Sequence, residues 1–231
     1  MLLNLANFDA AIVDLDGTMV DTLDDFVAAL DAMLADLSLP RVDAAAVGAM
    51  VGKGSEHLVR SVLRHVVPAT EDIDALYEPA FARYQHHYLD CNGRHSTVYP
   101  GVVEGLRALR ASGLQLACLT NKPTAFALPL LAQKGLDGFF VHVFGGDAFA
   151  RKKPDPLPLL KTCEALGIAP ARTLMIGDSS NDAQAARAAG CPVVLVSYGY
   201  NHGAPVRGVD ADAFVDALEE IAFLGTGHPL G

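Results

Sequence analysis

Apolar runs of strand length recur along the chain. The clearest of them cover residues 10–16, 114–121, 141–147, 173–178 and 192–199. Each run is apolar almost throughout and does not alternate with polar positions, which is typical of parallel strands covered on both faces. The pattern therefore predicts a mostly parallel β-sheet with a buried centre.

Helical patterns fill the spaces between most of these runs. They cover residues 101–113, 123–135, 155–167 and 180–190, and each ends at a glycine, which is a common helix stop. Strands that alternate with amphipathic helices build an open sheet with helices on both faces. The fold class predicted here is therefore α/β, with a doubly wound parallel sheet.

One block interrupts this alternation. Residues 21–94 contain no convincing strand, and their apolar positions predict helices within residues 22–39, 44–52, 55–67 and 73–90. About 70 residues are too many for a simple crossover between two strands. We therefore expect an inserted helical domain at residues 21–94, which covers one edge of the sheet, and an α/β core made of residues 1–20 and 95–231.

Composition narrows the partners of this chain. Its 231 residues are 51% hydrophobic, enough for a sizeable core, and carry a net charge of −10. That charge argues against nucleic acid or an anionic membrane surface as a partner, but a few local cations or one metal ion still allow a small anionic substrate. Neither a signal peptide nor a membrane span is evident, and the four cysteines form no C-x-x-C pair, so we expect a cytoplasmic location. The oligomeric state is left open.

Polar side chains stand where the predicted strands end. These residues are Asp14, Asp16, Thr120, Asn121, Lys153 after a short loop, Asp178, and Asp182 four positions further on. Alone, each has an ordinary explanation as a helix cap, a turn residue or a solvated surface charge. Because ligands of open α/β sheets bind at the carboxyl ends of the strands, their joint occurrence there favours a functional site.

The charges of these residues suggest a chemistry. Crowded carboxylates repel one another unless a cation lies between them, and oxygen ligands favour Mg²⁺, which often shares a substrate phosphate. Lys153 and Thr120 are suited to contact phosphoryl oxygens. One aspartate can attack phosphorus to form an aspartyl-phosphate, while its neighbour two residues on handles the proton, because side chains i and i+2 of an extended chain point the same way.

Four segments carry a family resemblance. The stretches "DLDGTMVDT", "LTNK", "KKPDP" and "GDSSNDAQAA" resemble, in order, the four motifs of the haloacid dehalogenase superfamily of phosphohydrolases. The resemblance implies a Rossmann-like core with an α-helical cap inserted after the first strand. That expectation agrees with the helical block at residues 21–94.

The resemblance also implies roles for the acidic residues. Asp14 corresponds to the nucleophile and a metal ligand, and Asp16 to the general acid and base, whose backbone carbonyl also binds the metal. Asp178 corresponds to a further Mg²⁺ ligand. Asp182 is expected to orient a metal-bound water or the active-site lysine.

The remaining motif residues are expected to bind the phosphate. Thr120 and Asn121 resemble the phosphate-binding pair of the second motif. Lys153, directly before Pro154, matches the motif lysine better than Lys152 does. The superfamily resemblance thus implies a Mg²⁺-dependent site for a small phosphorylated substrate.

A narrower resemblance covers nearly the whole chain. The stretches "YPGVVEGLRALRASG", "TNKPTAFALPLL", "MIGDSSNDAQAARAAGCP" and "YGYNHG" resemble the phosphoglycolate phosphatase family, which implies hydrolysis of 2-phosphoglycolate. In the insert, "VGKGSEHLV" resembles the glycine-flanked cap loop that closes over the substrate. This places Gly52, Lys53 and Gly54 at the substrate, with Lys53 facing its carboxylate, although a solvated surface lysine is the alternative.

Other activities share this core. Related sequences act on other small phosphate esters or on pyrophosphate, and sugar phosphomutases also resemble this pattern. A phosphonoacetaldehyde hydrolase uses a cap lysine as a Schiff base, but the loop around Lys53 offers no apolar pocket to activate it. A dehalogenase works without Mg²⁺ and without the second aspartate of the first motif. A phospho-receiver domain, the non-enzyme alternative, has no inserted helical domain.

Overall fold

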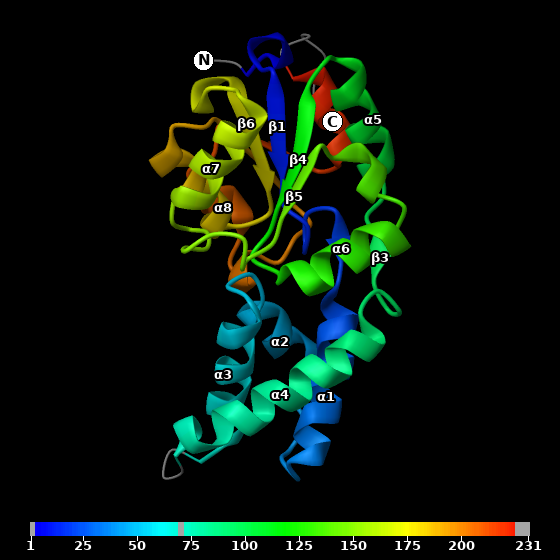
Figure 1. The fold of residues 1–231 in the computed structure, drawn as a ribbon, viewed down its shortest axis with the longest axis vertical. Helices are drawn as coiled ribbons and strands as arrows, with labels where there is room; N and C mark the ends of the chain where they lie inside the picture. Colours follow the sequence, from blue (N-terminus) through cyan, green and yellow to red (C-terminus); the bar gives the residue numbers. More distant parts are fainter. Residues whose placement is uncertain (1–2, 69–71, 225–231) are drawn as a thin grey trace.

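The structure, a computed structural model of the chain, describes residues 3–68 and 72–224 (Figure 1). An α/β core carries a six-stranded sheet, and a group of helices lies beyond the carboxyl ends of its strands. The outermost ends of the predicted core ranges, residues 1–2 and 225–231, lie outside the described residues.

The central sheet has the strand order β5-β4-β1-β6-β7-β8, and all its neighbouring strands are parallel. The strands are β1 (Ala10–Val13), β4 (Gln115–Leu119), β5 (His142–Phe144), β6 (Thr173–Gly177), β7 (Val193–Val196) and β8 (Ala213–Val215). The predicted α/β class and the first five strands are confirmed. β8 was missed, because three residues, of which only Val215 is fully buried, give too short an apolar run to stand out.

Both faces of the sheet are covered, which explains why its strands are apolar throughout. Within β1, Ala11 and Val13 pack into a cluster with α5 (Val102–Ala111) and α6 (Thr124–Gln133), whereas Ala10 and Ile12 pack on the opposite face. That second face is covered by α7 (Leu157–Leu166) and α8 (Ser180–Ala189). Burial on two sides requires an apolar side chain at every position of the strand.

Four helices form the group beyond the carboxyl ends of the strands, and we call them the cap helices. They are α1 (Leu23–Asp36), α2 (Ala44–Met50), α3 (Ser55–Val66) and α4 (Ile73–Cys91). They enclose a hydrophobic cluster of their own, in which side chains such as Leu30, Met33, Leu63, Tyr84 and Tyr88 are fully or almost fully buried. The predicted helices of the insert are therefore present.

Two chain crossings connect the core with the cap helices. Here β2 (Val20–Asp21) pairs with β3 (Thr97–Val98) as an antiparallel ribbon that the sequence pattern did not reveal. The buried carboxylate of Asp25, on α1, accepts hydrogen bonds from the backbone N–H groups of Gly93 (2.7 Å) and His95 (2.8 Å). These bonds compensate its burial and tie the returning chain to the first cap helix.

Short 3₁₀ helices complete the fold: η1 (Leu5–Asn7), η2 (Asp137–Phe139), η3 (Pro170–Arg172), η4 (Asn201–Gly203), η5 (Val206–Gly208) and η6 (Leu218–Phe223). Within residues 3–68 and 72–224, none of the helices has the length and apolar character needed to cross a bilayer. The cysteines Cys91, Cys118, Cys163 and Cys191 are free thiols.

Candidate active site

The chain turns sharply where β1 ends, and this turn presents the first acidic residues. The N–H of Asp14 donates to the carbonyl of Ile176 (2.9 Å), so the sheet holds the backbone at that residue. Gly17 follows with a φ of +81°, and a Cβ there would lie 2.4 Å from Oδ2 of Asp178. Only glycine combines this backbone conformation with such a close approach, so the "DLDG" turn packs directly on the loop after β6.

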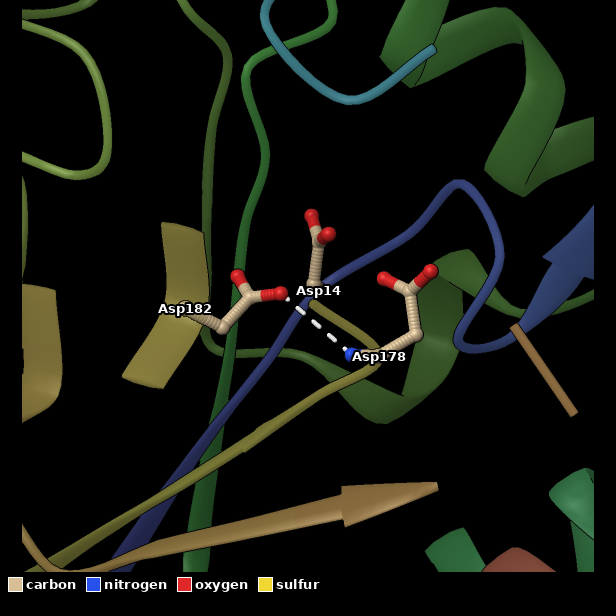
Figure 2. Close-up of side chains that lie close together, drawn as sticks. All are labelled: Asp14, Asp178 and Asp182. Carbon is tan, nitrogen blue, oxygen red and sulfur yellow. Dashed lines mark hydrogen bonds between the residues drawn. The ribbon is translucent and has the colours of Figure 1, made fainter. Parts of the chain in front are cut away.

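Three buried carboxylates gather at the carboxyl edge of the sheet. One carboxylate oxygen each from Asp14, Asp178 and Asp182 lies within 4.8 Å of the other two (Figure 2). Asp182 is fixed by its place at the start of α8, where its Oδ2 accepts hydrogen bonds from the N–H (3.1 Å) and hydroxyl (2.7 Å) of Ser179. This capping-box arrangement leaves its other oxygen to face the site.

The electrostatics of this cluster favour a bound cation. Burial raises the pKa of Asp14 to about 7, opposed by Lys153 and reinforced by Asp182. Burial also raises the pKa of Asp178 well above its ordinary value, and the charges of Asp182 and Asp14 raise it further. Buried carboxylates that resist joint ionisation are stabilised by a positive charge among them. The all-oxygen donor set fits a hard divalent ion such as Mg²⁺.

Lys153 is the ammonium group of this cluster. Its Nζ donates to Oδ1 of Asp182 (2.6 Å) and lies 2.9 Å from Oδ1 of Asp14, at an angle outside hydrogen-bond geometry. Burial alone lowers the pKa of Lys153, but the two aspartates outweigh it and the pKa is raised overall. The neighbouring Lys152 is partly exposed and instead pairs with Glu56 of α3 (2.8 Å). The lysine chosen from the motif therefore lies among the acids.

The two polar residues after β4 have different surroundings. Oγ1 of Thr120 accepts a hydrogen bond from the N–H of Lys122 (3.2 Å), which leaves the hydroxyl proton to donate to a ligand. The amide of Asn121 bonds to both the N–H (3.0 Å) and the carbonyl (2.8 Å) of Lys153. Asn121 thus holds Lys153 in place, and its contact with phosphate stays a prediction.

Asp16 lies beside the acidic cluster and not within it. Its Oδ1 accepts hydrogen bonds from the hydroxyl of Thr22 (2.8 Å) and from Nζ of Lys122 (3.0 Å). Asp14 and Asp16 nevertheless line one cavity, as the proposed division of labour between nucleophile and acid requires. The metal contact expected of Asp16 runs through its backbone carbonyl and stays a prediction.

The cap loop before α3 reaches the core. The carbonyl of Gly52 accepts hydrogen bonds from the side-chain amides of Asn121 (3.1 Å) and Asn181 (3.0 Å), and Nδ1 of His202 lies 2.8 Å from the carbonyl of Val51. These bonds bring the loop over the carboxyl ends of the strands. In this structure the cap helices are therefore docked on the core.

A small cavity of about 30 Å³ lies between the α/β core and the cap helices. Core and cap both line it, through Asp14, Asp16, Phe26, Val51, Gly52, Gly54, Ser55, Leu58, Thr120, Asn121 and Lys122. Gly52 and Gly54 line this cavity, and their contact with a substrate stays a prediction. The side chain of Lys53 is exposed and does not belong to this lining, so the structure does not bring it to the acids.

Lys122 is a site residue that sequence reasoning missed. It stands within the quoted segment "LTNK" and lines the cavity, and its side chain is only 2% exposed. The available signal was its place directly after Asn121 at the end of a strand. A lysine in a loop is usually solvated, so this signal alone did not single it out.

The parallel sheet, the buried acids with their lysine and the helices docked over them define a hydrolase of the haloacid dehalogenase type. A family profile described as "Hydrolase: haloacid dehalogenase-like hydrolase" matches residues 8–190, and the chain belongs to this family.

Within this family, the chain is similar to proteins named phosphoglycolate phosphatase. The chain is 47% identical over 217 residues to a phosphoglycolate phosphatase of Thiobacillus denitrificans, covering 94% of this chain and 95% of that protein. It is 45% identical to a plasmid-encoded phosphoglycolate phosphatase of Cupriavidus necator, covering 94% and 93%. A crystal structure described as a predicted phosphoglycolate phosphatase from Haemophilus somnus superimposes with a TM-score of 0.87 at 33% identity, covering 93% and 96%.

Proposed function

We propose that this protein is a Mg²⁺-dependent phosphatase that hydrolyses 2-phosphoglycolate to glycolate and phosphate through an aspartyl-phosphate. The observation that carries the proposal is the position of Asp14, which lines the cavity between the core and the cap helices and belongs to a triad of buried carboxylates; its Oδ1 lies 2.9 Å from Nζ of Lys153. The relatives named phosphoglycolate phosphatase support the choice of substrate.

The carboxylates of Asp14 and Asp178, with the backbone carbonyl of Asp16, would hold the Mg²⁺ ion. Asp182 would orient Lys153, whose Nζ lies 2.6 Å from Oδ1 of Asp182. When bound, the ion supplies positive charge that offsets the carboxylates and the phosphoryl group. Lys153 supplies further positive charge at the phosphoryl oxygens, and the hydroxyl of Thr120 donates a hydrogen bond to one of them.

The reaction proceeds in two displacements. A carboxylate oxygen of Asp14 attacks phosphorus, the bond from phosphorus to the ester oxygen breaks, and Asp16 gives its proton to the departing glycolate oxygen. A water molecule then attacks the same phosphorus while Asp16 takes up its proton. The bond from phosphorus to Asp14 breaks, which releases phosphate and restores both aspartates.

The small size of the cavity favours a small leaving group. A volume of about 30 Å³ has space for only a few water molecules, so even a phosphoryl group with a two-carbon acid needs the core and the cap helices to move apart before it enters. We propose that residues 21–94 move as a cap relative to residues 1–20 and 95–231, so that substrate enters when the cap opens and bulk water is excluded when it closes. The proposed setting is the cytoplasm, with a small phosphorylated molecule as the partner and neither nucleic acid nor membrane.

The test is phosphate release with Mg²⁺ across a panel of substrates. The panel contains 2-phosphoglycolate, pyrophosphate, phosphonoacetaldehyde, several sugar phosphates and p-nitrophenyl phosphate. We expect kcat/KM for 2-phosphoglycolate to exceed the others by about tenfold or more, equivalent to about 1.4 kcal/mol of selective transition-state binding. A higher value for another substrate would overturn the substrate assignment and leave the chemistry at Asp14 intact. Full activity after complete removal of divalent ions would overturn the role of Mg²⁺.

A further inference from the structure

Lys122 combines features that a surface lysine does not have. Its side chain is almost fully buried, and its Nζ donates to Oδ1 of Asp16 (3.0 Å) and to the hydroxyl of Tyr88. The same Nζ lies 4.6 Å from the ring centre of Phe26 and 4.7 Å from that of Tyr88. Burying an ammonium group is costly, so a lysine held this firmly between aromatic rings calls for an explanation.

Neutralising Asp16 explains only part of this arrangement. Asp16 already accepts a hydrogen bond from Thr22, and an ammonium group has three donors, of which two have partners among the described residues. Lys122 borders the cavity that also contains the nucleophile Asp14. One donor therefore has no hydrogen-bond partner among the described residues, on a side chain that lines this cavity.

The other candidate cations are placed differently. Lys153 is already engaged by Asp14 and Asp182, and the side chain of Lys53 is exposed. Among the described residues that line the cavity, Lys122 is the one cationic side chain. A second anionic group on a phosphorylated substrate would meet its opposite charge here.

The surroundings strengthen such a contact. Phe26, Leu58 and Val51 form apolar parts of the cavity wall, so a charge pair there is screened less than in water. Gly54 and Ser55, at the N-terminus of the 12-residue helix α3, line the same cavity and add partial positive charge. The cavity is thus suited to an anion beyond the phosphoryl group.

We propose that Lys122 binds the carboxylate of the substrate and is the main determinant of selectivity for phosphorylated carboxylic acids. This inference rests on the proposed function, because it presumes a substrate with a carboxylate close to the phosphate. Lys122 comes from the core, whereas Phe26 and Tyr88 come from cap helices α1 and α4. The binding group for the carboxylate is therefore completed only when the cap helices are docked.

The experiment compares two substrates in one preparation. 2-Phosphoglycolate and ethyl phosphate differ by a carboxylate in place of a methyl group, and the ratio of their kcat/KM values does not depend on the fraction of active enzyme. Lys122→Met is expected to lower this ratio on the order of 100-fold, mainly through KM for 2-phosphoglycolate. Lys122→Arg, which keeps the charge, is expected to restore part of the ratio. Lys161→Met, at an exposed lysine on α7, is the control and is expected to keep the wild-type ratio.

Three outcomes would overturn the proposal. An equal loss for both substrates in Lys122→Met would mean that Lys122 acts only through Asp16. A collapse of the ratio in Lys53→Met, with the ratio preserved in Lys122→Met, would assign the carboxylate to Lys53. A wild-type ratio near one would refute the proposed substrate itself, and the inference with it. If Lys122→Met does not fold, Lys122→Gln makes the same comparison while keeping a donor for Asp16 and Tyr88.

Discussion

Replacing Asp14 by asparagine should remove activity and stabilise the metal-free protein. Burial raises the pKa of Asp14 from 3.8 to about 7, so the folded protein binds this proton more tightly than the unfolded chain does. The stability from this group is complete at low pH and is lost as pH rises from about 4 through about 7. The difference between 3.8 and about 7 limits the loss of folding free energy from ionising Asp14 at pH 8 to about 4 kcal/mol.

The asparagine variant avoids the cost of a buried ionised carboxylate but loses the ion pair between Asp14 and Lys153. Lys153 still has Asp182 as its partner. We therefore expect the metal-free variant to be more stable than the metal-free wild type by about 1–3 kcal/mol at pH 8. The difference should shrink as the pH falls to 5. Turnover of 2-phosphoglycolate should fall by at least about 10⁴-fold, because the attacking oxygen is lost.

Two measurements test this reasoning. Urea unfolding in EDTA at pH 8 and pH 5 gives the free energies of unfolding, and phosphate release with Mg²⁺ gives the activity. Asp137→Asn, at an exposed position, is the matched control and should change neither quantity appreciably. Turnover by a variant shown by mass spectrometry to be free of deamidation would refute the nucleophile. A variant less stable than wild type at pH 8 would refute the electrostatic reasoning.

Two further predictions concern the same cluster. Lys153→Met leaves two buried carboxylates without their ammonium partner and should lower the free energy of unfolding by about 3–5 kcal/mol. Lys152→Met, at the partly exposed neighbour, should lower it by less than about 1 kcal/mol. Urea unfolding compares the two variants, and similar losses would contradict the placement of Lys153 among the acids. Adding Mg²⁺ to metal-free protein should raise Tm more at pH 8 than at pH 5.5, because Asp14 is ionised only at the higher pH. Thermal melts with and without Mg²⁺ measure this increase, and equal increases at the two pH values would count against a metal site that includes Asp14.

Local pattern was enough to predict most of the secondary structure. The five apolar runs became β1, β4, β5, β6 and β7, because strands buried on two faces must be apolar along their whole length. The β2–β3 ribbon and β8 were not foreseen, since strands of two or three residues carry too little pattern. Their pairing depends on which segments the rest of the fold brings together.

The acidic site was foreseen for a similar reason. Asp14 and Asp178 directly follow buried strands, and Asp182 lies in the first turn of α8, so parallel strand order alone brings them to one edge. The choice of Lys153 over Lys152 came from the motif, and the structure places Lys153 against two of these acids. The order of strands and motifs along the chain was therefore enough to predict that these acids and Lys153 lie together.

The sequence by itself determined the α/β class, the helical insert and the set of acids at the strand ends, because these depend on local periodicity and on chain order. Only the tertiary structure decided which lysine faces the cavity. Lys53 and Lys122 both stand in loop segments, and the place of Lys122 directly after Asn121 was too weak a signal to prefer it over Lys53. Docking of α1 and α4 buries Lys122 between Phe26 and Tyr88 and leaves Lys53 exposed, since burial is a property of contacts between distant segments.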